Sequence, residues 1–442
     1  MRRSLLFVLL LCAVRGATAQ LGLPGVRLPA LPAAGAPSLP ASQLLAPASD
    51  AAAALGELDP SSLRTLRQQR IRELLRRHRD VLEADPRGAP IVRGELLAFS
   101  PAAGAFQAAV AAGYTVLRER ELQGLSARLV VLHAPDDTAR SLARLQTLDP
   151  AGSYDFNHVY LPSGVSPDSP PPVPQPLAPS GAAGAAVAAV RVGLIDDGVD
   201  VRHVALRTVI IHPHGCGGSA TPAVHGTAIA SLLAGRADRF QGAAPGAELF
   251  AADVFCGRPT GGAVDEIAEA FAWLLREQVP VINVSLVGPA NRTLESVVAG
   301  AVARGYLIVA AVGNDGPAAP PLYPAAWPGV IGVTGVDARH RVLPEAERGP
   351  QVKFAAPGAD MTAARTPQGY ALVRGTSFAA PIVAGVLAQM LRSPDKAAAE
   401  QALADLERRA LHLGSPGVDP VYGYGLVGAD LAPAPALARL NK

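Results

Sequence analysis

The chain has 442 residues, a formal net charge of +2, 49% hydrophobic residues and 17% charged residues. This length exceeds one ordinary domain and is enough for a large buried core. A charge so close to zero argues against a nucleic-acid partner or an acidic membrane surface, because both favour a strongly basic chain.

The first 19 residues have the pattern of a secretory signal peptide. Arg2 and Arg3 precede the apolar run 5–14, and residues 17–19 supply the small side chains of a cleavage site. No later stretch approaches the roughly 20 apolar residues that a membrane helix needs. We therefore expect an exported, secreted protein without a membrane span, and the sequence leaves open whether it stays in the periplasm or becomes extracellular.

Residues 20–58 are rich in alanine and proline without a regular period, which is typical of a spacer without a fold of its own. In the Arg-rich residues 59–90, apolar side chains such as Leu63, Leu66 and Leu82 fall near one helical face. This segment is expected to form an amphipathic helix with a solvated basic face.

Residues 91–162 alternate short elements in the order β-α-β-β-α-β, which predicts a small α+β domain. The expected strands cover residues 95–99, 114–120, 127–133 and 154–160, and the expected helices cover residues 106–112 and 138–148. Residues 163–188 are rich in proline and are expected to form an exposed linker. A domain boundary is therefore predicted here.

Residues 189–436 combine many glycines and alanines with short β-branched runs. This composition predicts an α/β domain of three layers, in which helices cover both faces of a mostly parallel central sheet. The run 189–195 is typical of a buried parallel strand, and it ends at Asp196 and Asp197. Ligands of open α/β sheets bind beyond the carboxyl ends of strands, so Asp196 is a candidate functional residue.

Two further segments place a reactive side chain among small residues. His225 opens a helix of small and aliphatic residues. Ser377 belongs to the motif of residues 375–381, Gly-Thr-Ser-Phe-Ala-Ala-Pro, and lies in the first turn of an expected helix. Free N–H groups and the helix dipole stabilise negative charge near such a serine. Each residue alone fits an ordinary turn or cap, but the order Asp196, His225, Ser377 is that of a known catalytic triad.

These three motifs resemble the signatures of the subtilisin-like serine peptidases. The similarity runs from residue 189 to residue 436 and includes residues 242–249, 281–286, 310–316 and 422–427. It implies a serine endopeptidase in which His225 takes the proton of Ser377 and Asp196 orients the imidazole. It also implies that Asn314 and the N–H of Ser377 stabilise the oxyanion.

Asp197 departs from the family pattern, which usually has serine or threonine after the catalytic aspartate. Alternation along a strand sends Asp196 and Asp197 to opposite sides, so only one of them can face His225. Alignment of the motif favours Asp196. Three roles stay open for Asp197: a solvent-facing residue, a hydrogen-bonded turn residue, or a part of the substrate cleft.

The resemblance further implies a groove in which a peptide pairs with an exposed strand edge. The expected substrate-binding residues are Ser285, Leu286, Val287, Gly288, Ala311, Val312 and Gly313. Together with Leu322, the apolar members predict a pocket for an apolar residue before the cut. Asp315 lies at the rim of this predicted pocket, and its negative charge weakens the argument against a basic residue before the cut.

Removal of the leader leaves Cys216 and Cys256. In an exported protein of this family their elements would be neighbours, so we expect a disulfide, the alternative being two unpaired cysteines. His203, His212 and His214 lack the spacing of metal ligands and are expected in a solvated loop. We predict no metal ion in the site and no cofactor for the chemistry, and a structural calcium ion is left open.

The position of residues 91–162 before a peptidase-like domain resembles that of the family's propeptide, which assists folding and then blocks the groove. We expect a precursor cut between residues 160 and 188, the alternative being a domain that stays attached and regulates access. The expected partners are protein or peptide substrates and the chain's own propeptide, with the chain a monomer. A second class of function is a catalytically silent or self-inhibited binding module, against which the complete set Asp196, His225, Asn314 and Ser377 argues.

Overall fold

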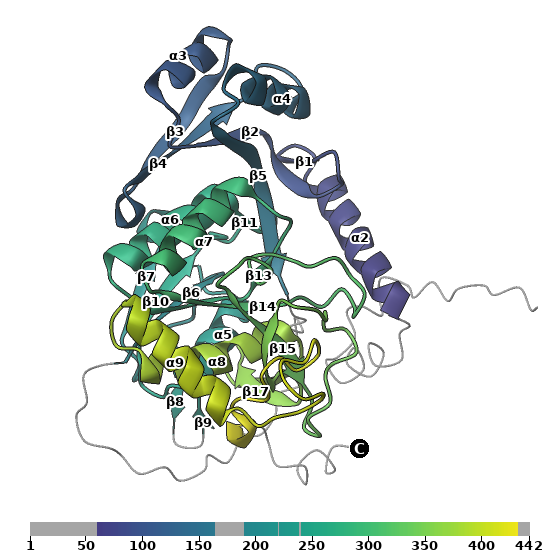
Figure 1. Cartoon of the computed structure of the whole chain (residues 1–442), viewed down its shortest axis with the longest axis vertical. Helices are drawn as coiled ribbons and strands as arrows, with labels where there is room; N and C mark the ends of the chain where they lie inside the picture. The colour runs from purple at the N-terminus through teal and green to yellow at the C-terminus, as the bar shows by residue number, and fades with distance from the viewer. Residues whose placement is uncertain (1–59, 164–189, 220, 238–239, 432–442) are drawn as a thin grey trace, which may run out of the picture. The chain divides into compact units, whose positions relative to one another are not determined.

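The computed structural model describes residues 60–163, 190–219, 221–237 and 240–431, which all belong to one unit of the chain, residues 41–442 (Figure 1). The predicted signal peptide, the spacer and nearly all of the predicted linker lie outside the described residues.

The Arg-rich segment begins with helix α2 (Pro60–Arg77), as expected. The prediction that Leu82 shares the face of this helix was wrong, because the helix ends at Arg77 and Leu82 opens strand β1 (Leu82–Ala84). Leu82 is buried there, in register with Val92. Apolar spacing alone did not reveal where the helix ends.

The elements of the α+β region follow in the expected order. They are β2 (Pro90–Phe99), α3 (Ala103–Ala111), β3 (Thr115–Leu122), the 3₁₀ turn η2 (Gln123–Leu125), β4 (Ala127–His133), α4 (Thr138–Leu148) and β5 (Ser153–Pro162). The strands pair antiparallel in the order β5-β2-β4-β3. Side chains such as Leu96 and Val130 face α3 and α4, where they pack with Ala109, Leu142 and Leu145.

A second sheet confirms the predicted α/β class. Its seven strands are parallel and have the order β16-β15-β14-β12-β6-β10-β7. They cover β6 (Arg191–Asp196), β7 (Ile211–His214), β10 (Glu248–Asp253), β12 (Val281–Val284), β14 (Leu307–Ala311), β15 (Ile331–Val336) and β16 (Val352–Pro357).

Helices cover both faces of this parallel sheet (Figure 1). They are α5 (Val224–Ala234), α6 (Val264–Arg276), α7 (Arg292–Ala303), α8 (Thr376–Met390) and α9 (Lys396–Arg409). Leu194 belongs to the core formed with α5, α8 and α9, whereas its neighbour Ile195 belongs to the core formed with α6 and α7. Successive side chains of β6 therefore pack in two apolar cores, one on each face of the sheet. The sheet and the helices on its two faces make three layers.

The remaining strands of the described residues are short, and four of them form two separate two-stranded sheets. They are β8 (Arg236–Ala237), β9 (Phe240–Gln241), β11 (Gly262–Ala263), β13 (Leu286–Val287), β17 (Met361–Ala364) and β18 (Tyr370–Val373). Strand β5 pairs antiparallel with β11 and β13, so its last residues belong to the α+β sheet and to the parallel-sheet domain at once.

The contact between the α+β domain and helix α6 is close. A side chain at Gly124 would come within 2.6 Å of Leu275 Cβ. Arg118 bonds both Glu95 and the buried Asp265, which lies in the first turn of α6, and Asn157 also donates to Asp265. A buried carboxylate is stable here because charged and polar donors compensate its lost hydration.

The prediction that His203, His212 and His214 lie in a solvated loop was wrong. His212 and His214 lie on strand β7, where their rings stack on Phe250 and Trp273 with centroids 4.4 Å apart in each pair. His203 is buried, with Nε2 2.7 Å from the carbonyl oxygen of Gly369. Within the described ranges, no helix combines the length and the apolar composition needed to cross a bilayer.

Candidate active site

Three elements bring Asp196, His225 and Ser377 together. Asp196 is the last residue of β6, His225 lies in the first turn of α5, and Ser377 lies in the first turn of α8. Nδ1 of His225 lies 2.7 Å from Oδ1 of Asp196, and Nε2 lies 3.1 Å from Oγ of Ser377. With Nδ1–H donating to the carboxylate, Nε2 is free to accept from the serine hydroxyl.

Burial and the neighbouring carboxylate act in opposite directions on His225. Burial alone would lower its pKa, but the charge of Asp196 and the hydrogen bond to it outweigh that effect, so the pKa of His225 is raised. A histidine of raised pKa is a stronger base at the moment when a proton leaves the serine.

The turn before Ser377 requires glycine. Gly375, the N-cap of α8, has a φ of 136°, which an L side chain rarely adopts. Beyond it, the carbonyl oxygen of Ser377 accepts a hydrogen bond from Ser285 Oγ at 3.0 Å, and Asn283 donates to the same hydroxyl. These contacts fix the first turn of α8 against the end of β12.

Asn314 lies beside this turn with one half of its amide engaged. Its Oδ1 accepts the N–H of Thr376 at 3.1 Å, whereas its Nδ2 is buried without a hydrogen-bond partner. Thr376 Oγ1 in turn accepts from the N–H of Gly313. A fixed amide with an unpaired N–H donor is suited to stabilise negative charge that develops on a substrate oxygen.

Asp197 takes one of the three roles left open for it, that of a hydrogen-bonded turn residue. Its carboxylate accepts the backbone N–H of Gly226, beside His225, and its own N–H donates to Asp196 Oδ1. Burial, with a smaller contribution from the charge of Asp196, raises the pKa of Asp197 to about 7. Asp197 thus ties the end of β6 to the start of α5.

The chain itself occupies the groove next to these residues. Leu161 and Pro162 of β5 pair with Val287 and Leu286, and the N–H of Ser163 donates to the carbonyl oxygen of Ser285 at 3.3 Å. Ser163 Oγ lies 3.1 Å from Thr376 Oγ1. The end of the α+β domain is therefore bound as an extended strand that leads to Ser377.

Tyr160 fills a slot earlier in this strand. Tyr160 is buried, and its hydroxyl donates to the carbonyl oxygen of Pro289 at 2.6 Å. A side chain at Gly288 would collide with the ring at 2.7 Å. Gly288, one of the predicted substrate-binding residues, thus provides the space for an aromatic side chain.

Three of the apolar residues predicted to line the pocket belong to the two cores of the parallel-sheet domain. Leu286 and Val312 pack in the core with α6 and α7, and Ala311 packs in the opposite core. The contacts with the end of β5 come from the backbone of residues 285–287. Gly313 has a φ of 117° and presents no side chain.

Sequence reasoning missed Glu347, which packs against Gly313. Its N–H donates to the carbonyl oxygen of Gly313, its Oε2 accepts from the N–H of Leu322, and its Oε1 is buried without a partner. Burial raises the pKa of Glu347 to about 9, and the charge of Asp315 adds to this shift. Nothing in the local sequence, a loop between β15 and β16, distinguishes this acid from a solvated one.

Helix α2 lies at the edge of the same site, a position that its sequence did not indicate. Arg67 Nε lies 3.0 Å from Asp315 Oδ2, and both side chains are mostly buried. A cavity of about 100 Å³ lies between α2 and the site, and its lining includes Leu63, Ser163 and Asn314.

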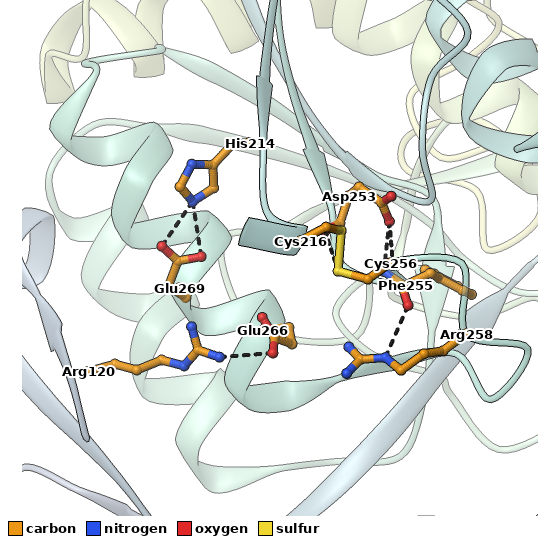
Figure 2. The surroundings of a disulfide bond; sticks show 9 residues. All are labelled: Arg120, His214, Cys216, Asp253, Phe255, Cys256, Arg258, Glu266 and Glu269. Atoms are coloured by element: carbon orange, nitrogen blue, oxygen red, sulfur yellow. Dashed lines mark hydrogen bonds and ion pairs between the residues drawn. A yellow bond between two sulfur atoms is a disulfide. The ribbon is translucent and has the colours of Figure 1, made fainter. Parts of the chain in front are cut away.

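The cysteines form the expected disulfide, Cys216–Cys256 (Figure 2). Figure 2 also shows Asp253, at the end of β10, whose carboxylate accepts the N–H groups of Phe255 and Cys256. The bridge joins the turn at Cys216, which precedes the helix of His225, to the turn that follows β10.

In the described part of the chain, two groups bring three potential metal ligands within reach of one another. One is Cys216, Asp253 and Cys256, in which both sulfurs are already bonded to each other. The other is Asp196, Asp197 and His225, whose Nδ1 is engaged by Asp196. Neither group leaves a set of free ligands of the kind that holds a divalent ion.

The domain has a parallel sheet between two layers of helices, and an Asp-His-Ser hydrogen-bond chain lies where one strand ends and two helices begin. This is the architecture of a serine hydrolase. The subtilase family model matches residues 188–425, more than half of the chain, and the chain belongs to this family.

Curated relatives match just under half of the chain. Minor extracellular protease Epr of Bacillus subtilis (strain 168) is 30% identical over 207 residues, which are 46% of this chain and 32% of Epr. The thermostable alkaline protease of Halalkalibacterium halodurans is 33% identical over 47% of this chain and 57% of its own length. Subtilisin BL of Lederbergia lenta is 34% identical over 47% of this chain and 77% of its own length. The first two matches thus span about a third and just over half of the relatives' lengths.

Among solved structures, fervidolysin from Fervidobacterium pennivorans has a TM-score of 0.61 and 21% identity, over 78% of this chain and 62% of fervidolysin. This likeness supports the fold.

Proposed function

We propose that the chain is the precursor of a secreted serine endopeptidase. The observation that carries the proposal is the buried hydrogen-bond chain from Asp196 through His225 to Ser377, next to an Asn314 amide with an unpaired N–H donor. Membership of the subtilase family supports the same reaction class.

In the proposed reaction, Ser377 Oγ attacks the carbonyl carbon of a peptide bond while His225 Nε2 accepts the hydroxyl proton. Asp196 stabilises the imidazolium through Nδ1–H. Asn314 Nδ2 donates to the oxyanion, and removing such a donor typically lowers kcat by about 10²–10³. The imidazolium then gives its proton to the leaving amine. Water next attacks the acyl-enzyme while His225 accepts a proton from it, and His225 returns that proton to Ser377 Oγ as the acid product leaves. All these groups come from the chain itself, so the proposed chemistry uses no cofactor.

We further propose that the α+β domain is an inhibitory propeptide and that the enzyme cuts after Ser163. Residues 160–162 pair with β11 and β13 along the groove. Directly after this segment Ser163 contacts Ser285 and Thr376, the residue before Ser377. This position falls within the range expected from the sequence. A strand bound in this way excludes other substrates for as long as it stays in place.

Export is part of this proposal. The leader pattern of residues 1–19 supports it, as does the disulfide, which is stable in oxidising compartments. One relative is itself named an extracellular protease.

The test compares the full-length chain with its Ser377→Ala variant and with Ser296→Ala as a matched control, because Ser296 is a partly exposed serine on α7 whose hydroxyl bonds only its own helix, at Arg292. We expect wild type and Ser296→Ala to be cut after Ser163, as intact mass shows, and to digest casein. Ser377→Ala should stay uncut and inert. If all three chains stay uncut and none digests casein, the endopeptidase proposal is wrong and the groove is better explained as a binding site held by its own domain.

A further inference from the structure

The helix that carries His225 has no side-chain cap from its own N-cap residue. That residue is Ala223, whose side chain cannot accept any of the N–H groups that the first turn of α5 leaves free. The N–H of Gly226, the residue after His225, is instead bound by the carboxylate of Asp197, just beyond the end of β6. A contact between distant segments therefore takes the place of a local cap at the turn that holds the imidazole.

The fit between Asp197 and this turn is close. A Cβ atom at Gly226 would lie 2.6 Å from Oδ1 of Asp197, so only glycine leaves room for the carboxylate. The same two segments are joined a few residues further on, where the N–H of Asp200 donates to Oγ1 of Thr227 at 2.9 Å. The start of α5 is thus fixed along the loop that follows β6, and Asp197 is the contact nearest to His225.

Asp197 contacts both members of the Asp196–His225 pair. Its N–H donates to Oδ1 of Asp196 at 2.8 Å, and this same oxygen lies 2.7 Å from Nδ1 of His225. Its carboxylate holds the backbone directly after His225. One residue therefore orients the acceptor and the donor of this hydrogen bond. A serine or threonine, which the family usually has at this position, carries no charge.

Asp197 also acts on His225 through its charge. Burial lowers the pKa of His225, and the charge of Asp196 and, to a smaller extent, the charge of Asp197 raise it. The titratable groups that act on Asp197 are Asp196 from β6, His225 from α5 and Asp253 from β10, which Figure 2 shows. An imidazolium at His225 therefore forms beside more than one carboxylate, and an ionised Asp197 adds to its stabilisation.

We propose that Asp197 is a positioning residue for the reaction: its ionised carboxylate caps α5 at Gly226 and so holds His225 between Asp196 and Ser377. Asp197 acts on the reaction through His225. The inference rests on the proposed endopeptidase function and assigns a role in it to the one residue of the triad motifs that departs from the family pattern.

The kinetic test compares Asp197→Asn and Asp197→Ala with wild type, in the full chain after its own processing. Asparagine keeps an oxygen for the N–H of Gly226 and removes only the charge. The acid limb of the pH profile should then move to lower pH by about half a unit or more, because the pKa of His225 falls. Alanine removes the cap as well, and kcat should fall by about tenfold or more with little change in KM, since a small misplacement of a catalytic group strongly slows the reaction.

Asp419→Asn is the matched control. Asp419 is a buried carboxylate that accepts the N–H groups of Val421 and Tyr422 in a turn of its own. This variant should keep both the kcat and the acid limb of wild type. A shift of the limb in Asp197→Asn alone separates a role at His225 from a general effect on folding, and this comparison is decisive even if Asp197→Ala fails to fold.

A second measurement does not depend on turnover. In the uncut Ser377→Ala precursor, the Nδ1–H of His225 that is bonded to Asp196 should give a downfield proton resonance in NMR spectra. We expect this resonance in the parent and in Asp197→Asn, and we expect exchange with water to broaden it in Asp197→Ala. A sharp resonance in Asp197→Ala, together with a kcat within about twofold of wild type, would refute the positioning role. An acid limb that stays in place in Asp197→Asn would refute the part of the charge.

The two measurements also separate this inference from the proposed function. If wild type cuts no peptide, the endopeptidase function is refuted, and the resonance alone then decides whether Asp197 positions His225. If wild type cuts and the Asp197 variants match it in kcat, acid limb and resonance, the endopeptidase function stands and the role of Asp197 is refuted.

Discussion

Arg67 Nε lies 3.0 Å from Asp315 Oδ2, so helix α2 is joined to the residue that follows Asn314. The side chains are only 20% and 13% exposed, and a pair shielded in this way is less screened by solvent than a surface pair. The contact links a segment outside the α+β domain to the edge of the candidate active site.

Arg67→Ala should release α2 from this edge. Loss of about 1 kcal/mol of binding, at the upper end for an ion pair near the surface, corresponds to about a fivefold faster appearance of peptidase activity after processing. The measurement is the lag before activity on a peptide substrate. Arg76→Ala is the control, because Arg76 is exposed and pairs with Glu73 on the same helix. Equal lags for wild type and Arg67→Ala would show that α2 does not restrain the site.

Asp196→Asn should shift the pH profile as well as lower the rate. In wild type, His225 must be neutral to act as a base, and its pKa is raised by Asp196. Activity should therefore fall as the pH drops through a value above the ordinary histidine pKa of about 6.5. Without the carboxylate the acid limb should move to lower pH, and kcat should fall by about 10⁴-fold. An acid limb that stays in place in the variant would mean that another group controls it.

Asn314→Ala should lower kcat by about 10²–10³-fold with little change in KM, because the oxyanion forms only during the reaction. The alanine also removes the acceptor for the N–H of Thr376. Asn314→Asp separates the two effects, since it keeps an oxygen for Thr376 and has no N–H to donate. A large loss in Asn314→Ala together with near-normal kcat in Asn314→Asp would contradict the role of Nδ2.

Tyr160→Phe should weaken the hold of the groove on the N-terminal region. The change removes the hydroxyl that donates to the carbonyl oxygen of Pro289 in a partly buried hydrogen bond, an effect of about 1 kcal/mol or fivefold. The lag before peptidase activity should shorten by this factor. Tyr154→Phe is matched in chemistry and burial, but its hydroxyl bonds Asp149 within the α+β domain. Equal shortening in both variants would assign the effect to the stability of that domain.

Removal of the disulfide should destabilise the domain by about 4 kcal/mol, as the chain-entropy model gives for the sequence separation of 40 residues between its cysteines. The variant Cys216→Ala/Cys256→Ala is compared with its parent in a Ser377→Ala background, which prevents self-digestion during urea unfolding. A reductant should destabilise the parent and leave the double variant unchanged. An unfolding midpoint equal to that of the parent would refute a stabilising role.

The parts that sequence predicted well are those in which a local pattern determines the outcome. Strand Ala127–His133 and helix Thr138–Leu148 have the predicted bounds, because a short continuous run of aliphatic residues marks the strand and a period of 3.6 residues marks the helix. Asp196, His225 and Ser377 were identified by short motifs, and the structure brings them within hydrogen-bond distance.

The parts that were missed depend on contacts between distant segments. Glu347 appears in the sequence as one acid in a polar loop, and only the tertiary packing buries it against Gly313. The apolar face of α2 predicted a helix but not the surface that it covers. His212 and His214 were assigned to a loop because their stacking partners, Phe250 and Trp273, lie on other elements.

Strand β5 holds two domains in one hydrogen-bonded sheet, since its residues pair with β2 on one side of the boundary and with β11 and β13 on the other. A cut after Ser163 would break the covalent chain and leave every one of these hydrogen bonds in place. The cut would therefore convert a tethered strand into a separate ligand, and the fraction of free enzyme would from then on depend on dilution. The amount of active enzyme would then depend more on the dilution of the protein than on the time of the cut.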